Sequence, residues 1–89
     1  MAYKLSWDAA ALDAMKHFRN HQPELAIAFE RVLDRLRLDG SVSGSSYYGD
    51  SISAHVVSVF VHGYAEQTVI WIRQPDDRPR IVYVGALDE

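Results

Sequence analysis

The second half of the chain decides the fold: residues 54–84 read AHVVSVFVHGYAEQTVIWIRQPDDRPRIVYV. Three runs within this stretch, 54–62, 67–73 and 80–84, are dense in β-branched and aromatic residues. Such runs are typical of strands, and the Gly-, Pro- and Asp-bearing segments between them are typical of turns. The stretch therefore predicts three consecutive strands, and strands joined by short turns pair antiparallel.

The hydrophobic pattern of the first half has a different period. Residues 3–7 alternate apolar and polar as a half-buried strand does, whereas residues 8–38 repeat apolar side chains at helical spacing. Pro23 interrupts the helical segment and suits the first turn of a second helix. Residues 47–52 are a candidate for a further edge strand. The predicted fold is α+β: an N-terminal strand, a two-helix hairpin, then a three- to four-stranded, mainly antiparallel sheet.

The composition indicates one globular domain over residues 1–89, with 48% hydrophobic and 24% charged residues. The chain has no cysteine, which excludes disulfides and thiolate metal sites and makes the cytoplasm the expected compartment. Lys4 and Asp8 interrupt any signal-peptide pattern, and no apolar run is long enough to cross a membrane. The net charge of −3 argues against non-specific binding to a phosphate backbone, which needs several lysines or arginines.

Alternation along the strands divides the side chains between two faces of the predicted sheet. A helical hairpin can cover only one face, and we expect that face to be aliphatic, with Val57, Val59, Val61, Ile70, Ile72, Val82 and Val84. The other face is then expected to carry Val56, Ser58, Phe60, His62, Val69, Trp71, Arg73, Ile81 and Tyr83. An aromatic and partly open surface of this kind indicates a partner or a ligand.

Several short segments of the chain have a familiar pattern. It begins with YKLSWDAA at 3–10, has VFVHGY at 59–64 followed by TVIW at 68–71, and closes with IVYVG at 81–85. These segments and the order of the predicted elements resemble the RelE/ParE superfamily of toxins from bacterial type II toxin–antitoxin systems. The likeness covers nearly the whole chain. It implies a RelE-like fold and a cognate antitoxin protein as partner, with no cofactor and no membrane.

The resemblance implies two activities, and the sequence leaves both open. RelE-like members cleave mRNA on the ribosome through a cluster of arginines and lysines, whereas ParE-like members poison DNA gyrase without that cluster. Where basic residues of the cluster are expected, this chain has residues 56–58, Thr68 and residues 86–88, none of which is basic. We expect an mRNA-cleaving inhibitor of translation. The alternative is a ParE-like gyrase poison or a catalytically degenerate protein-binding module.

Residues of the strand half suit RNA cleavage by attack of a ribose 2′-hydroxyl. That reaction needs a base, an acid and a cation that stabilises the charge developing at phosphorus. His62 is the predicted base or acid, and Arg73 or Arg80 is predicted to hold the phosphate by bidentate hydrogen bonds. Tyr83 is predicted to position the phosphate or to donate a proton.

Aromatic rings of the same predicted face offer contacts to bases. Phe60 and Trp71 are predicted to stack RNA bases. The simpler interpretation of the whole group is that His55 and His62 are surface residues at strand ends, and that Tyr83 only packs on the sheet.

Two further groups of residues resemble metal sites in part. His17 and His21 lie one helical turn apart, which is half of a metal site, but no third ligand is near them in the sequence. Asp76 and Asp77 lie between two prolines, as acidic residues of solvated turns do. The sequence therefore predicts neither a metal site nor a cofactor.

Overall fold

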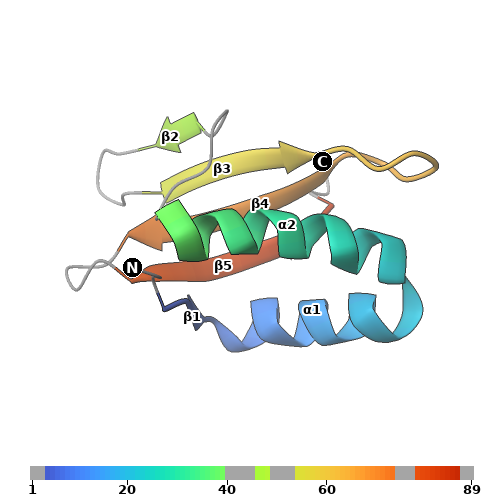
Figure 1. Ribbon diagram of the computed structural model, residues 1–89, viewed down its shortest axis with the longest axis horizontal. Helices are drawn as coiled ribbons and strands as arrows, with labels where there is room; N and C mark the ends of the chain where they lie inside the picture. Colours follow the sequence, from blue (N-terminus) through green and yellow to red (C-terminus); the bar gives the residue numbers. More distant parts are fainter. Residues whose placement is uncertain (1–3, 40–45, 49–53, 74–77, 87–89) are drawn as a thin grey trace.

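The computed structural model describes residues 4–39, 46–48, 54–73 and 78–86. Its helices and strands follow the predicted order, so the predicted α+β class is confirmed (Figure 1). The candidate strand at 47–52 lies partly in β2 and partly outside the described residues. The elements are β1 (Ser6–Trp7), α1 (Ala9–His21), α2 (Pro23–Asp39), β2 (Ser46–Tyr48), β3 (Ala54–Val59), β4 (Gln67–Arg73) and β5 (Pro79–Gly85).

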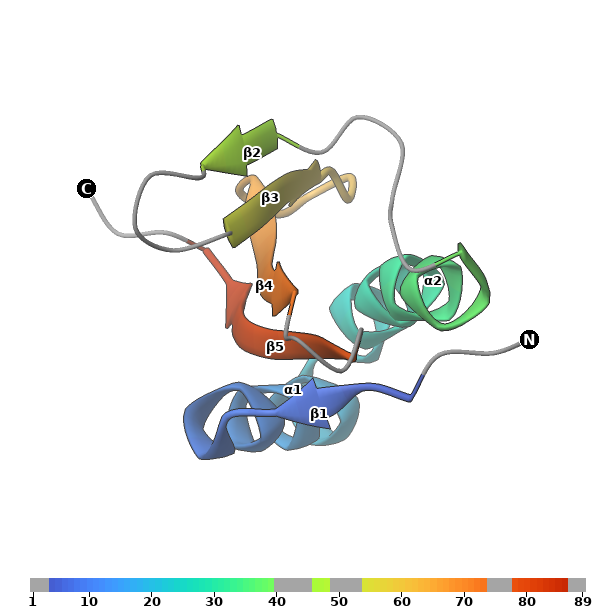
Figure 2. The same ribbon diagram turned by 90° about the vertical axis from the view of Figure 1, so that its left-hand side faces the viewer.

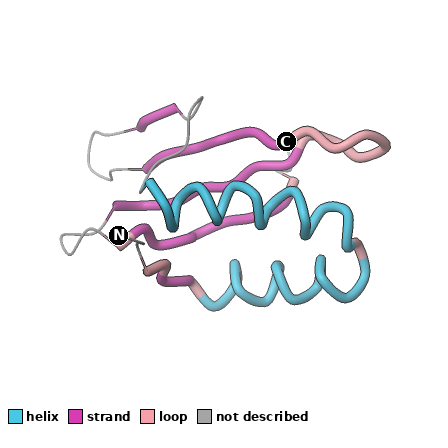
Figure 3. The backbone as a smooth tube through the Cα atoms, viewed as in Figure 1, coloured by secondary structure: helices cyan, strands magenta, loops and turns pink. Residues whose placement is uncertain are grey.

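The strands form one five-stranded sheet in the order β1-β5-β4-β3-β2. β1 lies parallel beside β5, with Ser6 opposite Arg80 and Trp7 opposite Ile81, and the other neighbouring pairs are antiparallel. The first strand of the chain is therefore one edge of the sheet, next to the last strand. The helical hairpin follows that edge strand and leads to β2 at the opposite edge (Figure 3).

The break between the helices falls where proline predicts it. The Gln22 N–H donates to the Phe18 carbonyl at 2.8 Å and closes α1. Pro23 begins α2, where its missing N–H costs no helical hydrogen bond. An ion pair between Arg19 of α1 and Glu30 of α2 joins the two helices. Within the described residues, neither helix is long and apolar enough to cross a membrane.

Both helices pack against the same face of the sheet, and no described helix covers the other face (Figure 2). Val59 and Val61 pack at the edge of the core, as predicted. Burying a large apolar side chain contributes about 1.5–3 kcal/mol, so this single cluster is the main source of stability. Its members are Ala11, Met15, Leu25, Phe29, Leu33, Leu36, Val57, Val69, Trp71, Ile81 and Val84.

The two faces of β4 are opposite to the prediction. Val69 and Trp71 are buried against the helices, whereas Ile70 and Ile72 are half-buried on the other face. The cause is the register of the β3–β4 hairpin, which sets Val57 opposite Val69. Residues opposite one another in an antiparallel pair point to the same face, and a shift of one residue exchanges the faces. Alternation in the sequence defines the two sets of side chains without saying which set is inside.

A bulge changes the alternation of β5. Ile70 is opposite Tyr83 but Trp71 is opposite Ile81, so Val82 is an additional residue on β5. Ile81 is consequently buried and Val82 is only half-buried. The sequence had placed Val82 on the helix-covered face and Ile81 on the other face, so both assignments were wrong. Tyr83 stays on the same side as Ile70, away from the helices, as predicted. An additional residue in one strand reverses the alternation beyond it, which a regular period of two cannot represent.

Candidate functional site

The side chains that point away from α1 and α2 define what we call the helix-free face. It is less aromatic than predicted, because Trp71 lies on the opposite side of the sheet. Phe60, one residue beyond β3, is 77% exposed, so its ring is available to a partner. The strand residues of the helix-free face include Ala54, Val56, Ser58, Thr68, Ile70, Ile72, Arg80 and Tyr83.

Trp71 is unsuited to the predicted contact with an RNA base. Only 1% of its surface is exposed, because it belongs to the core beneath the helices. A base stacks on an accessible ring face, and this ring has none free for it. The placement on the open face was wrong for the same reason as that of Val69: the hairpin register carries both side chains inward.

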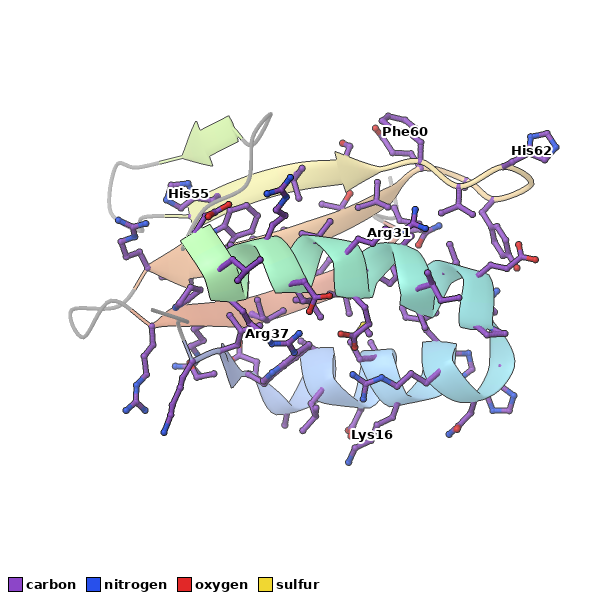
Figure 4. The ribbon with its side chains drawn as sticks, viewed as in Figure 1. Lys16, Arg31, Arg37, His55, Phe60 and His62 are labelled. Carbon is purple, nitrogen blue, oxygen red and sulfur yellow. The ribbon has the colours of Figure 1, made fainter. Side chains whose placement is uncertain are left out.

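The predicted catalytic residues lie at opposite ends of the sheet. His62 belongs to the connection 60–66 from β3 to β4, and Figure 4 shows its ring at the projecting end of the hairpin. Arg73 ends β4 opposite Pro79, where β5 begins. A strand of seven residues is about 20 Å long, so the structure does not bring His62 and Arg73 together. The role of each residue stays a prediction.

Arg80 and Tyr83 each have a partner within the chain. Arg80 Nε donates to Asp8 Oδ1 at 2.6 Å, which joins the start of α1 to β5. Tyr83 Oη donates to the carbonyl of Ala86. The carboxylate beside Arg80 offsets part of its positive charge, so Arg80 attracts a phosphate less than an isolated arginine does.

His55, which is not among the predicted catalytic residues, lies in the half of the sheet that contains Arg73. His55 is opposite Trp71 in the β3–β4 pair, and the two rings stack with centroids 5.4 Å apart and planes 12° from parallel. Arg73 follows Trp71 by two residues on β4, so it is a diagonal neighbour of His55 on the same face. We call His55, Trp71 and Arg73 the stacked-histidine cluster. Figure 4 shows His55 at the end of β3 away from His62.

The electrostatics of this cluster favour a neutral imidazole. Burial lowers the pKa of His55, and the positive charge of Arg73 lowers it further. Both effects oppose protonation, because burial and a nearby cation each disfavour a second positive charge. A neutral imidazole accepts a proton, so the cluster combines a base with a cation. The sequence alone does not show this cluster, because residues 55 and 73 are 18 positions apart and only the pairing of β3 with β4 brings them together.

Metal ligands do not gather in the part of the chain that the structure describes. No group of three His, Cys, Asp or Glu side chains there is arranged to hold an ion. His17 and His21 lie side by side on α1 with ring centroids 4.7 Å apart. Two imidazoles alone fall short of the three protein ligands usual for zinc, so this pair is a surface feature of α1.

A known protein shares the fold of this chain at low sequence identity. No family model and no curated protein matches the sequence. A solved structure, that of the YoeB dimer from Staphylococcus aureus, is similar with a TM-score of 0.72 and 10% sequence identity. The similarity covers 99% of this chain and 100% of that chain. It confirms the RelE-like fold that the sequence predicts, and at this identity it shows the fold alone.

Proposed function

We propose that this chain is the toxin component of a type II toxin–antitoxin system and inhibits translation by cleaving mRNA. The observation that supports it is the likeness to YoeB, which extends over essentially the full length of both chains. The sequence segments that resemble RelE/ParE toxins point the same way. The proposed partners are a cognate antitoxin protein, the ribosome and mRNA, and the proposed compartment is the cytoplasm.

Within this proposal the basic residues near the β4–β5 junction hold the phosphate of the RNA. Arg73 ends β4, and Arg80 is the second residue of β5, so both lie at the same end of the sheet. Arg73 is on the face of Trp71, and Arg80, opposite Ile72, is on the helix-free face. Tyr83 positions the RNA from the helix-free face, and the exposed ring of Phe60 stacks a base. His62, at the far end, contacts RNA or the ribosome away from the scissile phosphate.

Charge favours a second function, in which the chain binds a protein target and cleaves nothing. The net charge is −3, and Arg80 already pairs with Asp8. Ser58 and Thr68 occupy positions where the resemblance implies basic residues. A site with fewer cations stabilises the charge of the transition state less. The second candidate is therefore a ParE-like gyrase poison or a protein-binding module without nuclease activity.

Inducible expression of the chain in a bacterium separates these functions. Growth arrest accompanied by new mRNA 5′ ends in primer extension supports the mRNA-cleaving toxin. Growth arrest with a DNA-damage response and intact mRNA supports gyrase poisoning instead. Growth at the normal rate contradicts the toxin proposal altogether.

The antitoxin part of the proposal has its own test. A short gene beside the one that encodes this chain is expected to restore growth when the two are expressed together. Its product is also expected to co-purify with the chain. Co-expression that leaves growth arrested and yields no complex contradicts the assignment of that product as the antitoxin.

A further inference from the structure

We propose that the stacked-histidine cluster is the site where an RNA phosphodiester is cleaved, with His55 accepting the ribose 2′ proton and Arg73 binding the phosphate. This assignment rests on the proposed nuclease function and gives it a base other than His62. It requires no residue at the hairpin end of the sheet.

The backbone brings the two groups together without any loop. His55 is the second residue of β3 and Arg73 the last of β4, and the register sets His55 opposite Trp71. Diagonal neighbours on one face of an antiparallel pair are about 7–8 Å apart at their Cα atoms, which is within the reach of an arginine side chain. A phosphate oxygen can therefore contact the guanidinium while the ribose lies against the imidazole.

Trp71 holds the imidazole in place. The indole is buried in the core, and the His55 ring lies flat on it at a centroid distance of 5.4 Å. A base supported by a rigid ring on a strand keeps its direction toward the substrate better than one on an irregular segment. His62 is exposed in the 60–66 connection, whose sequence FVHGYAE contains no lysine or arginine to bind a phosphate.

The chemistry of the cluster suits the first step of RNA cleavage. His55 takes the proton of the 2′-hydroxyl, the 2′ oxygen attacks phosphorus, and the bond from phosphorus to the 5′ oxygen breaks. The 5′ oxygen takes a proton from solvent water, and the imidazolium of His55 returns its proton to solvent. The products are a 2′,3′-cyclic phosphate and a 5′-hydroxyl. Arg73 stabilises the additional negative charge on the phosphate oxygens by paired hydrogen bonds.

The low basicity of His55 supports this role. Burial and the charge of Arg73 lower its pKa, so the imidazole is neutral and ready to accept a proton near neutral pH. The same arginine that binds the phosphate thus favours the reactive form of the base.

The test measures cleavage of ribosome-bound mRNA by the purified chain and its variants. His55→Phe retains a flat ring on Trp71 but accepts no proton, and we expect it to lower the cleavage rate by about 100-fold or more. The matched control is His17→Phe on the exposed surface of α1, expected to change the rate less than about 3-fold. An unfolding midpoint equal to that of the unsubstituted chain shows that His55→Phe is folded, and His55→Gln replaces it if it is not.

Arg73→Gln is expected to lower the cleavage rate by about 100-fold as well, with Arg31→Gln on the exposed side of α2 as its control. Cleavage by His55→Phe and His55→Gln at the unsubstituted rate overturns the inference and leaves the nuclease function standing. Products with 5′-phosphate ends overturn it too, because 2′-hydroxyl attack leaves a 5′-hydroxyl. If the unsubstituted chain cleaves no mRNA, the nuclease proposal itself fails and this assignment with it.

Discussion

The two ends of the β3–β4 hairpin use the same kinds of residue in opposite ways. In the 60–66 connection, Phe60 is 77% exposed and His62 is exposed beside it. At the other end Trp71 is 1% exposed and the His55 ring lies flat against it. Trp71 lies in the core beneath the helices and His55 is half-buried beside it, whereas Phe60 and His62 are exposed to solvent. An aromatic ring and a histidine therefore indicate a site only once the register and the covering helices are known.

Removing an aromatic ring is expected to give the largest difference in stability between the two ends of the hairpin. Trp71→Ala leaves a cavity in the core and should lower the free energy of unfolding by about 3–5 kcal/mol. Phe60→Ala removes an exposed ring and should change it by less than about 0.5 kcal/mol. Urea denaturation followed by circular dichroism measures both. Similar losses in the two variants would contradict the burial of Trp71.

The two glycines with positive φ are expected to differ in the residues that they tolerate. Gly63, in the connection, has φ of 88° and open space around its Cβ position, whereas Gly85 of β5 has φ of 139°. Asparagine tolerates the left-handed region near Gly63, but not the conformation of Gly85. Gly85→Asn should therefore cost about 1–3 kcal/mol of stability, and Gly63→Asn much less. Thermal unfolding of both variants measures these losses of stability. Equal losses would contradict the expected backbone strain at position 85.

The Asp8–Arg80 pair joins β5 to the start of α1 and is expected to contribute modestly. The two side chains are 33% and 47% exposed, so solvent screens their attraction. Asp8→Ala should lower the free energy of unfolding by about 0.2–1 kcal/mol, and added salt should reduce the difference. Asp13→Ala, at an exposed position of α1, is the control for losing a carboxylate. A loss that salt leaves unchanged would indicate a role other than ion pairing.

The smallest expected effect is a loss of stability in acid through the half-buried His55. Its pKa is lowered in the folded state by burial and by Arg73, whereas a histidine of the unfolded chain has a pKa of about 6.5. Below that value the unfolded chain binds the proton first, so this part of the stability is present at higher pH and is lost as pH falls toward the folded-state pKa. Denaturant titrations at about pH 8 and about pH 5 measure it.

Two histidine variants, one at each end of the β3–β4 hairpin, test whether the loss of stability in acid comes from His55. His55→Phe should narrow the difference in unfolding free energy between the two pH values, because the phenyl ring cannot titrate. His62→Phe controls for the loss of a histidine at the exposed end. Equal narrowing in both variants would show that the contribution does not come from His55.

The sequence predicted the elements well because their signals are local. Pro23 and the helical period located the two helices, and β-branched runs located the three long strands. β1 was found from five alternating residues, although its pairing with β5 spans most of the chain. The site was harder to predict. Arg73 and Arg80 do lie at one end of the sheet, but His62 lies at the other and Trp71 is inside.

The amino-acid sequence by itself determined the order of the elements, the alternation within each strand and the absence of cysteine chemistry, because each depends on neighbouring residues or on composition. Only the tertiary structure decided which alternate set of side chains faces the helices. Hairpin register and the β5 bulge set that choice, and a shift of one residue turns a buried ring into an exposed one. The same register placed His55 against Trp71 beside Arg73, because strand pairing joins residues that are distant in the chain.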